Sequence, residues 1–158
     1  MKNLLYLLPI FLSLSCSNDN QNDKLVLNEN ESLVFSTYAG DPPVGFKPTF
    51  YKLTNSQVLK DEMSGFAFEA NNSQVNFIDL GSDKFNLTKD LINYFPNKLL
   101  TIERRIGNPG AADGGILYLQ LTKNGVAKIW ELDSDPNAVP EELRVFVRKV
   151  NEKINLLN

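Results

Sequence analysis

Two runs of alternating apolar and polar residues, separated by an Asn-Gly pair, form the most regular pattern in the chain. The runs cover residues 116–123 and 126–133. Asn-Gly favours a two-residue turn because both central positions need a positive φ, so the pattern predicts a β-hairpin. The short turn also fixes the register and places Leu119 opposite Trp130. One face then carries the residues that we assign to the core: Leu117, Leu119, Leu121, Val126, Trp130 and Leu132. The other face is half polar, and we expect it to meet solvent: Ile116, Tyr118, Gln120, Thr122, Ala127, Ile129, Glu131 and Asp133.

A second regular pattern lies near the end of the sequence, where apolar residues recur every three or four positions, as on one face of a helix. Pro140 suits the first helical position, and Glu141 and Glu142 suit the positive amino end of a helix. We expect this helix to dock on the face of the hairpin that carries Trp130. Its apolar stripe consists of Leu143, Phe146, Val147, Val150, Ile154 and Leu157.

Shorter patterns fill the rest of the chain. Runs of β-branched, aromatic and aliphatic residues bounded by turn residues predict strands over 33–39, 49–54, 57–60, 64–70 and 74–80. Asn86 is expected to cap a short helix over Leu87–Phe95, which Pro96 ends. Leu87, Leu91 and Phe95 lie four residues apart and should form the apolar face of this helix. Residues 99–106 fit either a strand or a helical turn.

These elements predict an α+β fold. We expect a single antiparallel β-sheet, with a long C-terminal amphipathic helix packed on one face and a short mid-chain helix. About 140 residues follow the apolar start of the chain, a length that suits one domain.

The start of the chain has the pattern of a secretory leader. An apolar run over residues 4–12 follows Lys2 and precedes Cys16, the only cysteine. The run is shorter than the roughly 20 residues that span a bilayer. Small residues before Cys16 and polar residues after it favour a lipoprotein signal that is cleaved before an acylated cysteine. The alternative is an ordinary leader with an incidental cysteine, but a free thiol in an oxidising compartment would invite intermolecular pairing.

The expected organisation follows from this leader. Residues 1–15 are a lipoprotein signal peptide, 16–30 carry the lipidated Cys16 and a polar tether, and 31–158 form the single α+β domain. The formal net charge of -3 does not favour nucleic acid as a partner. We therefore expect the protein to attach to the membrane through a palmitate-type lipid at its N-terminus, on Cys16. We expect an outer-membrane lipoprotein of the cell envelope, periplasmic or surface-exposed.

The residue types restrict the chemistry. The chain has no histidine and no cysteine besides Cys16, which excludes Ser-His triads, thiol catalysis and the commonest zinc ligand. Carboxylates remain, and the hairpin register brings Asp113 near Asp133. Two carboxylates about 5 to 9 Å apart can act as acid and base in glycoside cleavage. Alternatively, these aspartates shape and cap loops. Calcium at Asp113, Asp133 and Asp135 would lack the ligand spacing of a calcium loop, so neither a metal nor a cofactor is expected.

Aromatic residues beside the Gly40–Gly45 loop suggest a binding surface. The loop is rich in Pro and Gly, and it is flanked by Tyr38, Phe46, Phe50 and Tyr51. Aromatic side chains beside a rigid loop can form a binding rim, or they can fill the edge of the core. The Arg104-Arg105 pair could hold a carboxylate or phosphate, or lie on a solvated strand face. The candidate binding residues are Tyr38, Phe46, Tyr51, Asp113 and Tyr118.

The second half of the chain resembles a group of uncharacterised small lipoproteins of Bacteroidota. The resemblance rests on the lipobox-like leader, the Ala-Asp-Gly-Gly run at 112–115 where the group has an Ala-Asp-x-Gly-Gly loop, the Trp-containing hairpin and the terminal helix. Members of the group often carry cysteines in the loop before Ala-Asp-x-Gly-Gly, where this chain has Asn108 and Ala111. The resemblance therefore implies a fold and a cellular location, and it implies no disulfide, metal or activity here.

The preferred functional hypothesis is a membrane-anchored secreted lipoprotein that acts as a non-enzymatic binding or interaction module at the cell envelope. Its partner would be a protein or a glycan, bound at the aromatic region or on the open hairpin face. The alternative is a carboxylate-dependent hydrolase that acts on envelope glycans through Asp113 and Asp133.

Overall fold

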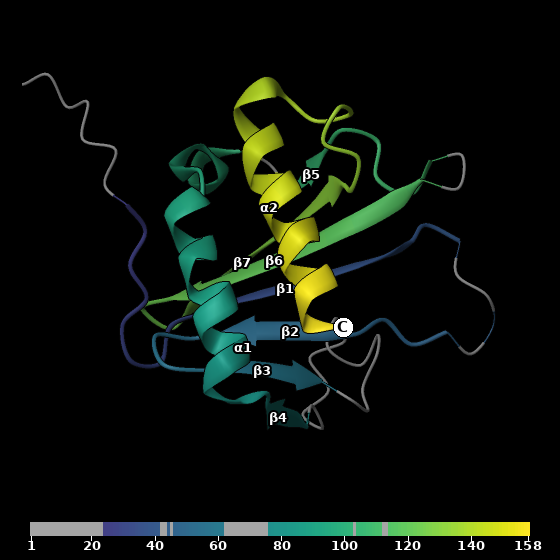
Figure 1. Ribbon diagram of the computed structural model, residues 1–158. Coiled ribbons are helices and arrows are strands. Elements are labelled where there is room, and N and C mark those ends of the chain that lie inside the picture. Colours follow the sequence, from purple (N-terminus) through teal and green to yellow (C-terminus); the bar gives the residue numbers. More distant parts are fainter. Residues whose placement is uncertain (1–23, 42–43, 45, 62–75, 103, 112–113) are drawn as a thin grey trace, which may run out of the picture.

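The computed structural model describes residues 24–41, 44, 46–61, 76–102, 104–111 and 114–158 (Figure 1). Within this part of the chain, the hairpin around Asn124-Gly125 is formed by β6 (Gly115–Lys123) and β7 (Val126–Asp133). Leu119 pairs with Trp130, as the two-residue turn predicts. Both turn residues have positive φ, 51° and 76°, which explains the choice of Asn and Gly.

The described strands form one seven-stranded sheet in the order β4-β3-β2-β1-β6-β7-β5. The five strands outside the hairpin are β1 (Ser32–Ala39), β2 (Phe50–Leu53), β3 (Val58–Asp61), β4 (Phe77–Asp79) and β5 (Arg105–Ile106). Every neighbouring pair is antiparallel except β5 with β7, so the expectation of a wholly antiparallel sheet is wrong at this edge. The expected strand over 64–70 lies outside the described residues.

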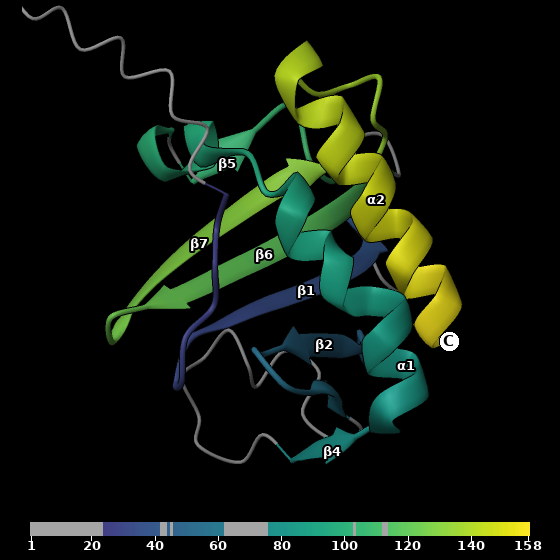
Figure 2. The ribbon, with the colours of Figure 1, turned by 60° about the vertical axis from the view of Figure 1, so that its left-hand side comes forward.

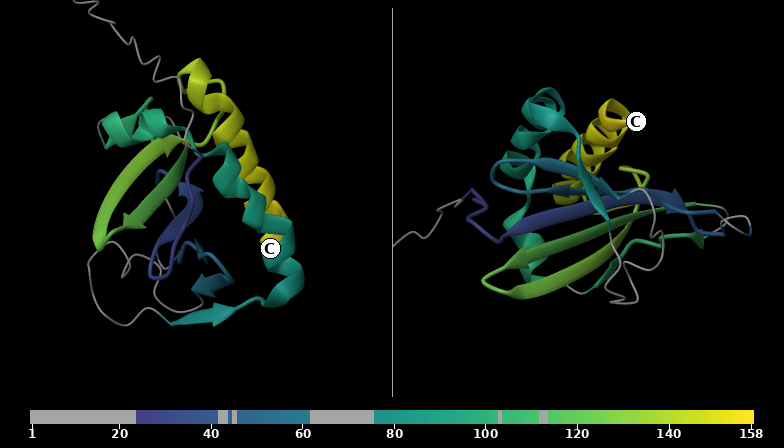
Figure 3. Two further views of the ribbon diagram at one scale, coloured as in Figure 1. Left: turned by 90° about the vertical axis from the view of Figure 1, so that its left-hand side faces the viewer. Right: turned by 90° about the horizontal axis from the view of Figure 1, so that it is seen from below.

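The helical segments all lie on one face of the sheet (Figure 3). They are α1 (Gly81–Thr88), the 3-10 segments η2 (Lys89–Tyr94) and η3 (Asn97–Thr101), and α2 (Glu141–Leu157). The whole predicted apolar stripe of α2 is buried. No helix of the described residues is long and apolar enough to cross a bilayer.

The mid-chain helix differs from its prediction. It begins at Gly81, whose N–H donates to the Asp79 carboxylate at 2.9 Å, so the expected cap Asn86 lies inside the helix. The α-helix then tightens into η2, whose three residues per turn break the four-residue spacing on which the predicted apolar face depended. As a result Leu91 is buried, whereas Leu87 is 48% exposed.

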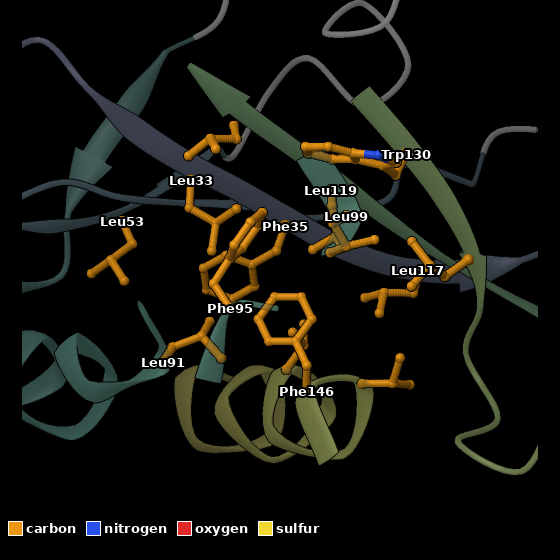
Figure 4. Close-up of a cluster of buried hydrophobic side chains, with 14 of the residues drawn as sticks. Leu33, Phe35, Leu53, Leu91, Phe95, Leu99, Leu117, Leu119, Trp130 and Phe146 are labelled. Carbon is orange, nitrogen blue, oxygen red and sulfur yellow. The ribbon is translucent and has the colours of Figure 1, made fainter. Parts of the chain in front are cut away.

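The main core lies between the sheet and the helical segments (Figure 4). Trp130 is fully buried there, as predicted. Its direct aromatic neighbour is Phe95, with ring centroids 6.0 Å apart, and Phe95 in turn contacts Phe146 at 5.4 Å. The segment after η2 therefore links the tryptophan to α2. Val126, which we assigned to the core, is 69% exposed because the hairpin tip extends beyond the helical layer (Figure 2).

Residues 24–27 cross the helix-bearing side of the sheet as an extended segment, which we call the strap (Figure 2). Leu25 and Leu27 are buried in the main core, whereas Lys24 and Val26 are exposed. The folded domain therefore includes Leu25 and Leu27, which lie in the range where we expected the polar tether.

Candidate functional site

The structure separates the residues of the expected aromatic rim. Tyr51 is only 1% exposed and faces the helices, where its hydroxyl donates a hydrogen bond to Asn158 Oδ1 at 2.7 Å. Burial raises the pKa of the Tyr51 phenol. Phe35 packs beside it, with ring centroids 5.8 Å apart. Tyr51 is thus a core residue and cannot serve as a rim side chain, which corrects our expectation.

Tyr118 lies on the opposite face of the sheet and is also fully buried. Our expectation that this side chain meets solvent is therefore wrong. It packs against Val34 and Phe50 in a second, smaller core cluster, with an edge-to-face contact of 5.3 Å to the Phe50 ring. Its hydroxyl donates to Gln120 Oε1 at 3.0 Å. Tyr38 is half-buried against the same cluster. Of the four candidate aromatic residues, only Phe46 is exposed, at 42%.

The aspartates at the end of the hairpin serve as loop caps. The expected pairing of Ile116 with Asp133 is confirmed, and Asp113 lies outside the described residues. Asp133 Oδ1 accepts the N–H of Asp135 at 2.9 Å, and Asp135 Oδ1 accepts the N–H of Asn137 at 2.9 Å. Within the described residues, no group of three His, Cys, Asp or Glu side chains could hold a metal ion. Cys16 also lies outside them.

Backbone contacts between glycines lock the loops at this end of the sheet. The Gly40 N–H donates to the Gly114 carbonyl oxygen at 3.0 Å. A Cβ atom added at Gly40 would lie 2.2 Å from the Cα of Gly110, which itself has a φ of +77°. The two loops can approach this closely only because neither position carries a side chain. The loop end of the sheet is therefore a packed structural junction.

The paired arginines are held by one carboxylate. Arg104 Nη2 lies 3.1 Å from Glu131 Oε1, and Arg105 Nε lies 3.9 Å from Glu131 Oε2. Arg105 also donates to the carbonyl oxygen of Pro109 at 2.9 Å. Among the described residues here, two exposed guanidinium groups and one carboxylate leave a net positive charge beside the outer side of β7. This arrangement agrees with a solvated strand face that retains some attraction for anions.

The outer side of β7 is a feature that the sequence analysis missed. Among the described residues, β7 pairs on this side only through Glu131 and Leu132, which contact β5. In an antiparallel hairpin, alternate residues point their backbone N–H and C=O groups away from the partner strand. Glu131 is one of these residues, because its N–H donates outward to the Arg104 carbonyl oxygen at 2.8 Å. Ala127 and Ile129 have the same parity, so their backbone groups also point outward, where no described strand meets them.

A pocket of about 270 Å³ lies between the strap, the β2–β3 turn and the α1–η2 segment. Its walls are largely apolar, and Lys24 and Lys89 are the charged residues that line it. Within the described structure, neither lysine forms an ion pair. Lys89 Nζ donates to Asn86 Oδ1 at 2.8 Å and lies 6.0 Å from the centre of the Phe85 ring. No sequence pattern predicts this pocket, because its walls come from three separate segments.

Glu31 is a buried carboxylate at the tight turn before β1. Its Oε2 accepts the N–H of Asn28 at 2.9 Å, and its Oε1 accepts the N–H of Asn124 at 3.3 Å. These backbone hydrogen bonds, with the Asn28 bond first, hold the pKa of Glu31 below its ordinary value. Glu31 thus connects the start of β1 to the tip of the hairpin, and both carboxylate oxygens are used in the fold.

Comparisons with known protein families, with curated proteins and with solved structures find no match for this chain.

Proposed function

We propose that the protein is a membrane-anchored lipoprotein of the cell envelope that binds a partner protein through the outer edge of β7, without catalysing a reaction. The partner would add an extended segment to the sheet as a further strand. The observation that carries this proposal is the pair of outward backbone positions, Ala127 and Ile129, that the described strands leave free. Such an edge is a template for another strand, and peptide recognition by strand addition uses it.

The side chains around this edge suit a protein partner. Val126 and Ala127 are exposed, and Ile129 is half-buried, so an added strand would cover apolar surface at the hairpin tip. Arg104 and Arg105 lie beside the other end of the edge and favour an acidic residue there. The mixture of apolar and charged groups is typical of non-obligate protein interfaces. An aromatic platform for a glycan is less well supported, because Tyr51 and Tyr118 are buried.

The hydrolase alternative finds no comparable support. Asp133 already accepts a backbone hydrogen bond within its own loop. We therefore retain the binding module as the proposed function.

The test uses a proline that removes one outward N–H. Ala127→Pro deletes a donor that the β6–β7 ladder does not use, whereas Ala127→Thr keeps it and serves as the matched control. Each variant is expressed in the cells that naturally make the protein, crosslinked to its neighbours in the intact cells, and purified together with any protein that it has captured. We expect Ala127→Thr to capture the same protein as the wild type and Ala127→Pro to lose it, with both variants folded by circular dichroism. Equal capture by a folded Ala127→Pro protein would refute strand addition, and capture only of a second copy of this chain would replace the proposed partner by self-association.

The proposed lipid anchor has its own test. Cys16→Ser removes the acylation site that we expect, so labelled fatty acid should enter the wild-type protein and not the variant. The variant should also move from the membrane pellet to the soluble fraction. A Cys16→Ser protein that still pellets with membranes would contradict the anchor.

A further inference from the structure

We infer that the pocket beneath the strap binds a small anionic amphiphile, namely a free carboxylate with an unbranched chain of about eight carbons. This inference is independent of strand addition at β7, because no residue of β7 lines the pocket. It rests on the nature of the walls, the charge at the rim and the volume.

The walls provide an apolar environment. Leu27 comes from the strap, Leu53 from the end of β2, and Phe85 and Ile92 from the α1–η2 segment. Leu27 and Leu53 are buried, and Phe85 and Ile92 pack half-buried against the main core, so the pocket opens directly above it. An aliphatic chain placed here would remove apolar surface from water on both the ligand and the pocket walls. Binding sites for small molecules commonly combine such walls with a few polar groups.

The charge at the rim selects the head group. Lys24 and Lys89 line the pocket, and none of the described residues that line it is acidic. Neither lysine has a carboxylate partner in the described structure, in contrast to Lys98 and Lys149, which each pair with a glutamate. Two unpaired ammonium groups beside an apolar pocket complement an anion attached to an apolar body. Asn55 and Asn93 also line the pocket and can donate hydrogen bonds to the same head group.

The volume sets the length of the ligand. At about 270 Å³, the pocket lies at the small end of ligand-binding pockets, which commonly have volumes of about 300 to 1,000 Å³. A chain of about eight carbons with part of its carboxylate fills this space. A hexadecanoyl chain is about twice as long and would leave half of its methylene groups in water. The pocket therefore does not fit the acyl chains expected on Cys16 or those of a membrane lipid.

The probe for this inference is sodium octanoate, titrated into the full chain with Cys16→Ser, which keeps acyl groups and detergent out of the assay. Binding is followed by the ¹H–¹⁵N chemical shifts of backbone amides, with 1-octanol as the uncharged analogue. We expect saturable shifts that centre on Leu27 and Ile92, and octanoate binding roughly fivefold tighter than octanol. Fivefold corresponds to about 1 kcal/mol, a reasonable sum for two partly exposed ion pairs.

The variant Lys24→Gln/Lys89→Gln tests the role of charge. It should weaken octanoate binding about fivefold and leave octanol binding unchanged. The control Lys47→Gln/Lys60→Gln removes two lysines that do not line the pocket and should bind octanoate like the parent chain. The Ala127→Pro change should also leave octanoate binding intact, which separates this inference from the proposed function.

Several results would overturn the inference. Chemical-shift changes that centre elsewhere would show that octanoate does not bind in this pocket. Equal binding of octanoate and octanol would show that the charge of Lys24 and Lys89 does not contribute to binding. An affinity that keeps rising from octanoate to dodecanoate would contradict the size limit. Binding to anionic phospholipid vesicles that depends on Lys24 and Lys89, without octanoate binding, would assign these lysines to the membrane surface instead.

Discussion

Trp130 offers a test of the core in which two substitutions at one position should behave differently. The indole is fully buried, and its Nε1 is the one buried side-chain nitrogen or oxygen in the described structure that has no hydrogen-bond partner. The ring packs against Phe95, and Lys128 Nζ lies 5.4 Å from its centre. The residue therefore combines a large favourable burial with one unfavourable polar group.

The expected magnitudes follow from these two contributions. Trp130→Ala removes the whole ring and should reduce the free energy of unfolding by about 3 to 5 kcal/mol. Trp130→Phe keeps most of the ring and loses about 1 kcal/mol of apolar burial. It also removes the unpaired N–H, whose burial costs about 1 to 3 kcal/mol. The phenylalanine variant should therefore be as stable as the wild type or up to about 2 kcal/mol more stable.

Urea unfolding followed by far-UV circular dichroism measures both variants without relying on tryptophan fluorescence. The free energy of unfolding falls by about 1 to 3 kcal/mol for each molar of urea. The urea midpoint of Trp130→Ala should therefore lie about 1 M or more below that of the wild type. The wild-type emission maximum should be that of a buried indole, since Trp130 is the only tryptophan. A loss of more than about 3 kcal/mol for Trp130→Phe would show that the N–H stabilises the fold, and it would refute the reasoning.

Three further predictions concern single residues. Gly40→Ala should destabilise the protein by about 1 to 3 kcal/mol, because the new Cβ would lie 2.2 Å from the Gly110 Cα. Gly81→Ala meets no atom within 4 Å and should cost only about 1 kcal/mol, because Gly81 has a positive φ. The melting temperatures of the two variants test this difference. Because the pKa of Glu31 is lowered in the folded protein, the ionised carboxylate stabilises the fold above the ordinary glutamate pKa of about 4.3, and this stability is lost as the pH falls through the folded-state pKa. Glu31→Gln should therefore make the melting temperature less dependent on pH in the acidic range. An unchanged pH dependence would contradict this. Lys153→Met should cost about 2 kcal/mol in urea unfolding, because the buried Nζ donates to the Leu87 carbonyl at 2.6 Å and pairs with an aspartate at 2.7 Å, and a neutral effect would show that these bonds contribute nothing.

The hairpin and the last helix could be predicted because each depends on local information. The Asn-Gly turn determines strand register without reference to the rest of the chain, and the spacing from Leu143 to Leu157 determines which helix face is buried. Elements shaped by distant contacts were harder to predict. The Phe50–Leu53 strand has an aromatic residue on each face, so its sequence does not show that Tyr51 faces the helices and Phe50 the other side.

The candidate site was harder to predict than the fold. The free edge of β7 depends on the shortness of β5, and a two-residue parallel pairing leaves no periodicity to detect. The pocket depends on the strap, whose alternating Leu25 and Leu27 lie in a segment that we expected to be a tether. In both cases the decisive feature is where one segment stops relative to another, and composition carries little information about that.

The Gly40–Gly110 contact has a consequence for how this sequence can change over generations. At most buried contacts a larger residue on one side can be accommodated by a smaller residue on the other, as when a leucine and an alanine exchange volume. Here both partners are already the smallest residue, so no second substitution can make room for the first. The two loops can drift only if their backbones separate, and the hydrogen bond from Gly40 to Gly114 opposes that movement. Related sequences should therefore keep glycine at both positions or replace both loops together.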